Sequence, residues 1–261
     1  MAVTTKTIPK AQDLARAIQF EGLSHRIAVN RKDGSVMVHV PEGEFTIGDG
    51  QGTDCPKHQV FVSAYWIGVY AVTNAQYLKF VEATGHRAPN NQVHREAGKA
   101  AHPVTDISWD DATAYATWAG CALPTEAQWE KAARGPKGLI YPWGNDWGAS
   151  RCRHDKNKGS ETTCAVSSYP GGVSSYGTYN QSGNVWEWCA DWYGNDYYGK
   201  SPARDPRGPE GGSIRVNRGG GWWGDDPVYF RGARRDWCVP GIRWDNLGFR
   251  LVRPASPSIP S

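Results

Sequence analysis

The stretch LPTEAQWEKAARG, at residues 123–135, does most to decide the fold of this chain. A proline precedes Thr125, and the pattern Thr-x-x-Gln that follows is a capping box, which begins a helix. Trp129, Ala132 and Ala133 lie on one face of that helix, and Gly135 ends it. We therefore expect a short helix that is buried against a sheet.

Two more helices are expected from the same kind of signal. Thr73 or Asn74 caps a helix that Gly85 ends, and Ser108 opens another with the capping pattern SWDD, which stops at Gly120. Their alternation of alanine and aromatic residues fits helices with one buried face. The sequence thus predicts about three helices.

Strands are expected before and after the helices. VMVHVPEGEFTIG, at residues 36–48, indicates two short strands around a Pro-Glu-Gly turn, and residues 59–72 continue with β-branched and aromatic residues. Residues 215–252 begin and end with strand-like runs. Between Gly135 and that last element there is little periodicity, and the 13 Trp, 12 Tyr, 31 Gly and 17 Pro of the chain favour loops held by buried aromatic rings.

Composition excludes several classes of protein. The 261 residues are 39% hydrophobic and 21% charged, which suits one globular domain. No apolar run approaches the ~20 residues of a membrane span. The net charge of +3 gives no argument for a nucleic-acid partner. The first 20 residues lack the apolar run of a secretory signal, so the default expectation is a cytoplasmic protein.

The six cysteines form no CxxC pair and have no zinc-site spacing, so we expect reduced, mostly buried thiols. If one local disulfide forms, Cys152 and Cys164 are the pair expected to make it. The domain organisation that we predict is an extension at residues 1–34, with Leu14, Ile18 and Phe20 at near-helical spacing, a domain at 35–254 and a tail at 255–261.

Several ordered motifs resemble one known family. They are PEGEFTIG at 41–48, HPVTDISWDDATAYATWAG at 102–120, LPTEAQWEKAARG at 123–135, YGTYNQSGNVWEWCADWY at 176–193, RVNRGGGW at 215–222 and NLGFRLV at 246–252. Together they resemble the formylglycine-generating enzyme family, also called the sulfatase-modifying-factor family. The resemblance implies an α+β fold, a loop-rich variant of the C-type lectin fold with short antiparallel strands. In such a fold, Trp129, Trp186, Trp188 and Phe249 are expected in the core.

The resemblance also implies a structural calcium ion at the turn GNVWEW. Carried over residue by residue, its ligands are Asn180, Gly183, Val185 and Glu187. Calcium takes six to eight oxygens in flexible geometry, which backbone carbonyls of such a turn can supply. The alternative is that Glu187 forms an ion pair with an arginine of the closing strand.

The family's oxidase activity depends on copper held by two cysteine thiolates just after the motif matching RGGGW. Residues 222–236 of this chain, WWGDDPVYFRGARRD, contain no cysteine, and Cys238 stands alone. Soft thiolates are the ligands that Cu(I) needs. The iron-dependent branch of the family uses histidines of a further helical domain, for which this chain has no room. We therefore expect neither copper nor iron, and lean away from an enzyme.

The closing segment is similar in layout to that of another branch of this fold, the variable proteins of diversity-generating retroelements. Their variable segment runs from an RGGSW-like strand to a GFR-like strand, which here gives residues 222–246. An Asn codon altered at its adenines cannot encode Trp, Lys, Gln, Glu or Met. Between Trp223 and Asn246 there is no Lys, Gln, Glu or Met, and the three Trp would be framework.

The sequence therefore predicts a non-catalytic binding protein whose partner is expected to be a protein. Aromatic, Arg and Asp side chains concentrate in this segment, as they do in binding hot spots. The predicted binding residues are Trp223, Asp225, Asp226, Tyr229, Arg234, Asp236, Ile242, Trp244 and Asp245. The alternative is an oxidoreductase of the formylglycine-generating enzyme family, or another enzyme of unknown substrate.

Overall fold

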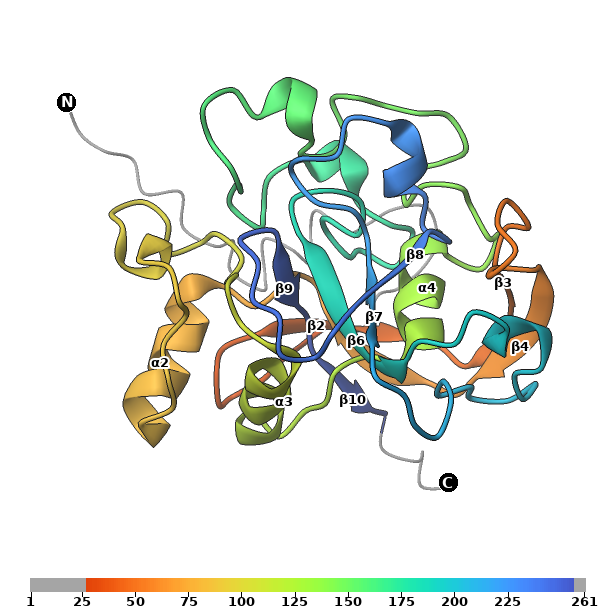
Figure 1. Cartoon of the computed structure of the whole chain (residues 1–261), viewed down its shortest axis with the longest axis horizontal. Helices are drawn as coiled ribbons and strands as arrows, with labels where there is room; N and C mark the ends of the chain where they lie inside the picture. The colour runs from red at the N-terminus through yellow and green to blue at the C-terminus, as the bar shows by residue number, and fades with distance from the viewer. Residues whose placement is uncertain (1–26, 256–261) are drawn as a thin grey trace.

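The computed structural model describes residues 27–255, and within them the chain folds into three sheets and three α-helices (Figure 1). The first sheet, in the order β1-β2-β5-β10, consists of β1 (Ile27–Val29), β2 (Val36–Val40), β5 (Tyr65–Gly68) and β10 (Val252–Pro254). A hairpin pairs β3 (Gly43–Ile47) with β4 (His58–Val62). The third sheet, in the order β8-β7-β6-β9, consists of β6 (Trp186–Trp192), β7 (Arg215–Arg218), β8 (Arg235–Cys238) and β9 (Leu247–Phe249).

The helices are α2 (Asn74–Thr84), α3 (Trp109–Trp118) and α4 (Glu126–Arg134). Each begins with a complete capping box, at Thr73, Ser108 and Thr125. Gly85 ends α2 in the left-handed region, at φ 71°, where its N–H donates to the Val81 carbonyl. The predicted helices and the α+β, C-type lectin-like architecture are thus confirmed.

The third sheet packs between two helices, with α3 and α4 on opposite sides of β6 and β7 (Figure 1). On the α3 side, Trp186, Trp188 and Phe249 belong to a core cluster that includes Tyr115. On the α4 side, Trp129 packs with Cys189 and Val216. The four aromatic residues predicted to be core are all buried.

The irregular region between α4 and β7 is held by ring contacts, as its composition indicates. Tyr141 and Trp143 stack with centroids 5.3 Å apart and planes 5° apart. Trp147 stacks on Phe230 at 5.2 Å, which joins this region to the closing segment. All six cysteines are free thiols, as expected, so Cys152 and Cys164 do not form the one local disulfide that the sequence left open.

Three strands depart from the sequence-based expectations. Strand β1 lies inside the extension predicted at 1–34 and pairs with β2, so the sheet starts before residue 35. Strand β6 lies in the region where the sequence shows no periodicity. Nearly every residue on both of its faces is buried, so the alternation of apolar and polar residues that marks a half-exposed strand is missing. Strand β8 lies within the predicted variable segment. The helical spacing of Leu14, Ile18 and Phe20 falls outside the described residues.

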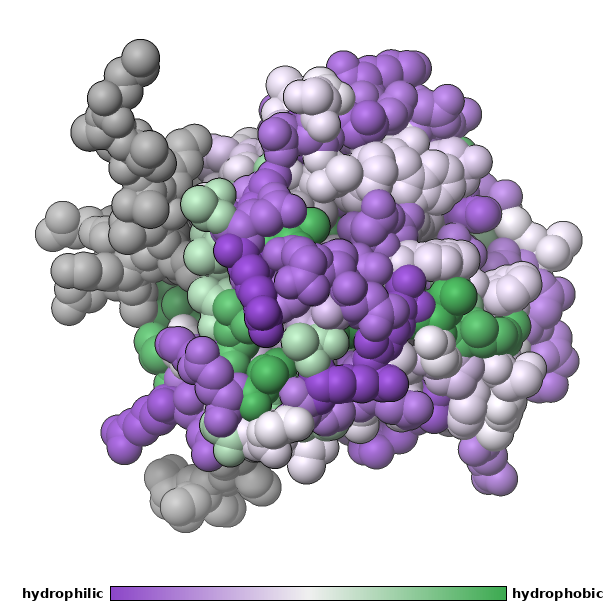
Figure 2. All heavy atoms as spheres, turned by 60° about the vertical axis from the view of Figure 1, so that its left-hand side comes forward, coloured by the Kyte–Doolittle hydropathy of each residue, from purple (hydrophilic) through white to green (hydrophobic). Residues whose placement is uncertain are grey.

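On the face drawn in Figure 2, hydrophobic residues form small, separate groups among hydrophilic ones. Among residues 27–255, no helix combines the length and the apolar character needed to cross a bilayer.

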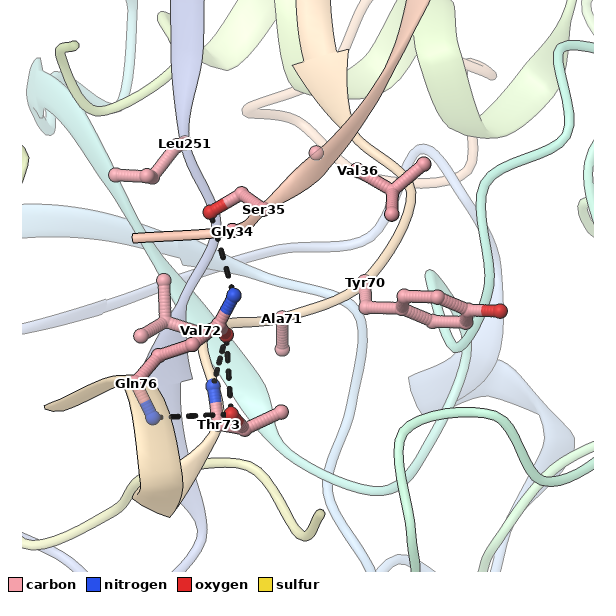
Figure 3. Close-up of a pocket in the computed structure, with 10 residues that line it drawn as sticks. Gly34, Ser35, Val36, Tyr70, Ala71, Val72, Thr73, Gln76 and Leu251 are labelled. Atoms are coloured by element: carbon pink, nitrogen blue, oxygen red, sulfur yellow. Dashed lines mark hydrogen bonds between the residues drawn. The ribbon is translucent and has the colours of Figure 1, made fainter. Parts of the chain in front are cut away.

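A small cavity lies where β2, β5 and the start of α2 meet (Figure 3). Val36, Tyr70 and Gln76 line it, and its volume of about 30 Å³ is room for one water molecule. Gln76 is committed to the capping box of α2. The cavity is therefore a packing defect and is too small to be a ligand site.

Candidate functional site

The closing segment, residues 222–246, connects β7 to β9 and contains the 3-10 helix η5 (Pro227–Phe230) and strand β8. Strand β8 is antiparallel to β7, and β7 to β6, while β9 is parallel to β6. Strands β8 and β9 therefore run in the same direction at opposite edges of the sheet. The connection 239–246 must therefore cross the sheet between them, and all of its residues except Asn246 are exposed or half-buried.

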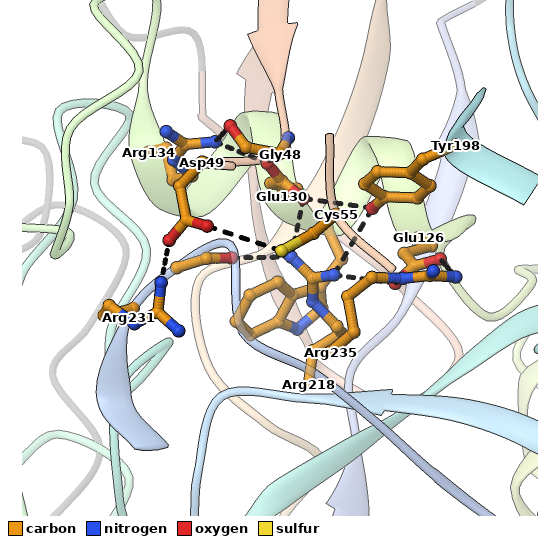
Figure 4. Close-up of polar contacts among 12 residues, drawn as sticks. Gly48, Asp49, Cys55, Glu126, Glu130, Arg134, Tyr198, Arg218, Arg231 and Arg235 are labelled. Atoms are coloured by element: carbon orange, nitrogen blue, oxygen red, sulfur yellow. Dashed lines mark hydrogen bonds and ion pairs between the residues drawn. The ribbon is translucent and has the colours of Figure 1, made fainter. Parts of the chain in front are cut away.

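Buried ion pairs fix the strand before the segment, β7, and the strand within it, β8 (Figure 4). Arg218 of β7 donates to Glu126 at 2.6 Å and to Glu130 at 2.7 Å, both on α4. Arg235 of β8 forms a bidentate pair with Glu126, at 2.8 and 2.9 Å. Arg218 also donates to the Gly232 carbonyl at 2.6 Å. The backbone of the segment is thus tied to α4 by charge-assisted hydrogen bonds.

In the same network, the pKa values of two neighbouring acids, Glu126 and Asp191, shift in opposite directions. Burial would raise the pKa of Glu126, but Arg235 and Arg218 hold it below its usual value, so this carboxylate is charged. Burial raises the pKa of Asp191 to about 8, and the charge of Glu126 adds to the effect. The Glu126 N–H donates to Asp191 Oδ2 at 2.8 Å.

Asp191 predicts a pH dependence that the variant Asp191→Asn should lose. The folded pKa lies above the ordinary 3.8, so the folded state holds a proton that the unfolded state has released. The contribution of Asp191 to the free energy of unfolding is therefore largest at low pH, and it falls as the pH rises toward about 8. Asparagine stays neutral, so the melting temperature of the variant relative to the wild type should rise between pH 5 and pH 9. Parallel pH profiles of the two proteins would contradict the assignment.

None of the nine residues predicted to bind a partner is fully buried, and two of them, Ile242 and Tyr229, pack against core clusters. Trp223 and Trp244 are 45% and 48% exposed. The aspartates Asp225, Asp226 and Asp245 are exposed as well. The other four are half-buried: Tyr229, Arg234, Asp236 and Ile242.

Several of these residues interact with one another or with their neighbours in the segment. The rings of Trp223 and Tyr229 lie 5.9 Å apart, and the neighbouring Trp222 Nε1 donates to the Asp245 carbonyl at 3.3 Å, so the two ends of the segment meet. Asp226 caps η5 by accepting from the Val228 N–H at 2.9 Å. Burial raises the pKa of Asp236 on β8, and the charge of Arg234, just before that strand, opposes the effect.

Sequence reasoning missed part of this surface. Val228, Trp237 and Val239 are also exposed, with Trp237 at 48%. Three of the four tryptophans of the segment, Trp223, Trp237 and Trp244, are about half exposed, and of these only Trp237 was not among the predicted binding residues. Trp237 lies on the edge strand β8, and Trp223 and Trp244 lie in the connections on either side of that strand. The sequence signal for this exposure is the small and polar residues that follow the tryptophans, as in GDDP and VPG.

The predicted calcium turn contains the ion pair that was its alternative. Glu187 accepts from Arg250 Nε at 2.6 Å and Nη2 at 2.7 Å, and from Trp129 Nε1 at 2.7 Å. Its carboxylate is therefore largely satisfied. Asn180 Oδ1, in contrast, is buried without a partner within residues 27–255. Calcium at this turn stays a prediction, with Asn180 as the side chain that fits an ion best.

Chelation tests that prediction. An ion bound only by the folded state at about 100 times its Kd stabilises it by ~2.7 kcal/mol. Adding EDTA to calcium-loaded protein should then lower Tm by several degrees, and Asn180→Ala should reduce the shift. An unchanged melting curve after exhaustive dialysis against EDTA would end the calcium hypothesis.

The closing segment offers no thiolate pair. Cys238 is buried, its thiol accepts from Asn217 Nδ2 at 3.4 Å, and burial raises its pKa to about 12. A soft metal needs thiolates, and this group is held as a thiol. In the part of the chain that the structure describes, no group of three or more His, Cys, Asp or Glu side chains is arranged to hold a metal ion.

Comparison with known proteins agrees with these motifs. A family model described as "Sulfatase-modifying factor enzyme 1-like domain" matches residues 24–255. The formylglycine-generating enzyme of Streptomyces coelicolor is 36% identical over 283 residues, which cover 84% of this chain and 89% of that protein.

Solved structures show the same fold. PvdO from Pseudomonas aeruginosa superposes with a TM-score of 0.77 at 26% identity, covering 88% of this chain and 98% of that one. Treponema denticola variable protein 1 superposes with a TM-score of 0.72 at 24% identity, covering 88% and 99%. Proteins with quite different descriptions thus share this scaffold.

Proposed function

The chain belongs to the sulfatase-modifying factor family, and on that premise we propose that it is a non-catalytic variable protein of a diversity-generating retroelement. Its function is to bind a protein partner through residues 222–246, displayed on a C-type lectin-like scaffold. The residues proposed to make contact are the nine predicted from the sequence, together with Val228, Trp237 and Val239.

One observation carries the proposal. Of the six large hydrophobic residues that are exposed within residues 27–255, five lie in the closing segment: Trp223, Val228, Trp237, Val239 and Trp244. Exposed aromatic residues beside Arg and Asp are the side chains of which binding hot spots consist. Their gathering in one segment supports a contact surface.

The scaffold supports variation at these positions. The residues that hold the segment, Arg218, Arg235 and Arg250, are buried and ion-paired, whereas the exposed positions contribute little to the core. A change at an exposed position therefore leaves the anchors intact. A protein described as a variable protein has the same fold, which supports the scaffold part of the proposal.

The genome beside this gene tests diversification. We expect a reverse transcriptase and a near-copy of the codons for residues 222–246 that differs at adenines. If neither is present, the retroelement part of the proposal fails. The three exposed tryptophans should be found unvaried among copies, because Asn codons altered at adenines cannot encode them.

A triple variant tests binding through the surface. Trp223→Ser, Trp237→Ser and Trp244→Ser together should leave the melting temperature within a few degrees of the wild type, because each ring is already half in water. The same protein should lose any partner that the wild-type protein retains in affinity purification. Retention of the partner by a folded triple variant would contradict the proposal.

The enzyme alternative has its own support, since relatives at 36% identity are described as formylglycine-generating enzymes. Against it stand the absence of cysteine from residues 222–236 and the buried, solitary Cys238. Incubation with a cysteine-containing sulfatase peptide, oxygen and copper decides between them. Stoichiometric conversion of the peptide cysteine to an aldehyde would restore the enzyme and reject the binding protein.

A further inference from the structure

A second recess lies beside the closing segment, at the end of the molecule where η2 (Asp155–Asn157), η3 (Pro170–Gly172) and η5 gather, at the top of Figure 1. It is an open hollow of about 520 Å³. Trp147 and Tyr169 supply rings to its wall, and Asp225 and Pro227 of the closing segment complete it. Such a volume holds one or two small ring-shaped molecules.

The aromatic walls are held rigidly. Trp147 is stacked on Phe230 at 5.2 Å and meets the edge of His154 at 5.6 Å. Tyr169 has a left-handed backbone, at φ 61° and ψ 57°, which is rare for a bulky residue. Its hydroxyl donates to Asn157 Oδ1 at 3.4 Å. The backbone at Tyr169 is therefore strained in the conformation that places its ring in the wall of the hollow.

The floor is also fixed in advance. The Asn157 side chain donates to the carbonyls of Ala149 and Cys152, at 3.0 and 2.8 Å, and accepts from the His154 N–H at 3.0 Å. His154 Nε2 is engaged by the Ala149 carbonyl at 2.9 Å. These groups are therefore occupied in shaping the hollow, and a preorganised site loses less entropy on binding.

The remaining polar groups are exposed and of mixed character. Asp225 offers a carboxylate acceptor, Lys156 an ammonium donor, and Ser150 a hydroxyl that can do both. One negative and one positive charge balance each other, which disfavours a strongly charged ligand. A ligand with many hydroxyl groups suits acceptors and donors together, and its C–H face suits an aromatic wall.

We propose that this hollow binds a neutral polyhydroxylated ring, a hexose or N-acetylhexosamine residue of a glycan, between Trp147, Tyr169 and Asp225. The inference goes beyond protein binding by the closing segment, and Asp225 is the one residue of the hollow that is also proposed to contact the protein partner. The hollow binds the sugar through fixed framework residues, and the segment contributes the one acceptor that can vary.

Saturation-transfer NMR on the full chain tests the proposal. The probes are the methyl glycosides of glucose, galactose, mannose and N-acetylglucosamine, with N-acetyl-arginine amide as a charged comparison. At least one glycoside should receive saturation from the wild-type protein. No transfer to any of the four, or stronger transfer to the arginine probe, would overturn the proposal.

Two variants locate the binding. Tyr169→Gly removes the ring at a backbone angle that glycine adopts without strain, so folding is preserved and transfer should be lost. Asp225→Ala should weaken binding about tenfold, the effect of one lost charge-assisted hydrogen bond. Glu82→Ala, exposed on α2, is the matched control and should bind as the wild type. Equal transfer in all three variants would place the sugar elsewhere and overturn the proposal, while leaving the triple-tryptophan test of protein binding untouched.

Discussion

Replacing Glu126 by Gln is expected to lower the free energy of unfolding by about 3–5 kcal/mol, the usual cost of removing one charge from a buried ion pair. Glu126 accepts one hydrogen bond from Arg218 and two from Arg235, and all three side chains are buried. The amide introduced by the substitution would keep the volume and lose the charge. Arg218 would keep Glu130, which it shares with Arg134, whereas Arg235 would lose the carboxylate with which it is paired.

The loss should depend on pH in a defined direction. The folded pKa of Glu126 is depressed, so its contribution is present above the ordinary value of 4.5 and disappears as the pH falls through the folded value. The stability difference between wild type and Glu126→Gln should therefore be full at neutral pH and shrink in acid. Urea denaturation at pH 7 and at pH 4 measures both values.

Asp191→Asn is the matched control, because it makes the same carboxylate-to-amide change next to Glu126. The raised pKa means that Asp191 is mostly protonated at neutral pH, so a neutral amide resembles its folded form. Its stability cost should be far smaller than that of Glu126→Gln. Equal losses for the two variants would show that packing, and not charge, decides the stability of this cluster.

The helices could be predicted because their signals are local. Thr73, Ser108 and Thr125 each lie three residues before the partner that completes the capping box. Strand β6 could not, because both of its faces are buried and the period of two that marks a half-exposed strand is missing.

The candidate surface was predictable only in part. Its position follows from the order of motifs, and none of the nine proposed residues is fully buried. The Arg235 anchor did not follow from sequence, because Arg235 finds Glu126 across 109 residues, whereas the pair of Glu187 with Arg250 is the alternative to calcium that the sequence offered. The sugar-sized hollow was equally hidden, since Trp147, Tyr169 and Asp225 meet through tertiary folding alone.

Gly183→Ala is expected to cause the second large loss, of several kcal/mol, from the turn that precedes β6. Gly183 has φ 79°, which costs an L-residue about 1–2 kcal/mol. A Cβ atom there would also lie 2.3 Å from the Arg153 carbonyl oxygen, a backbone atom that cannot rotate away. The Arg153 carbonyl accepts the Asn184 N–H at 3.1 Å, so moving it breaks a further bond.

Gly85→Ala separates the two costs. Gly85 has a similar φ of 71°, yet a Cβ atom there would meet nothing within 4 Å. That variant should lose only the conformational cost of about 1–2 kcal/mol. The excess loss of Gly183→Ala, measured by denaturation under identical conditions, then reports the close backbone approach. Similar losses of stability at both sites would mean that the turn at Gly183 can shift to accommodate the Cβ atom at little cost.

The turn at Gly183 also connects stability to the binding surface. Its N–H donates to the Gly219 carbonyl at 2.8 Å, and the carbonyl of the next residue, Asn184, accepts the Trp222 N–H at 2.9 Å. A turn displaced by the Gly183→Ala substitution therefore shifts the start of the closing segment, so partner binding should weaken together with stability. Because this loss arises from a backbone clash, it should persist in EDTA, whereas a turn held mainly by calcium would show the difference between wild type and variant only in the presence of the ion.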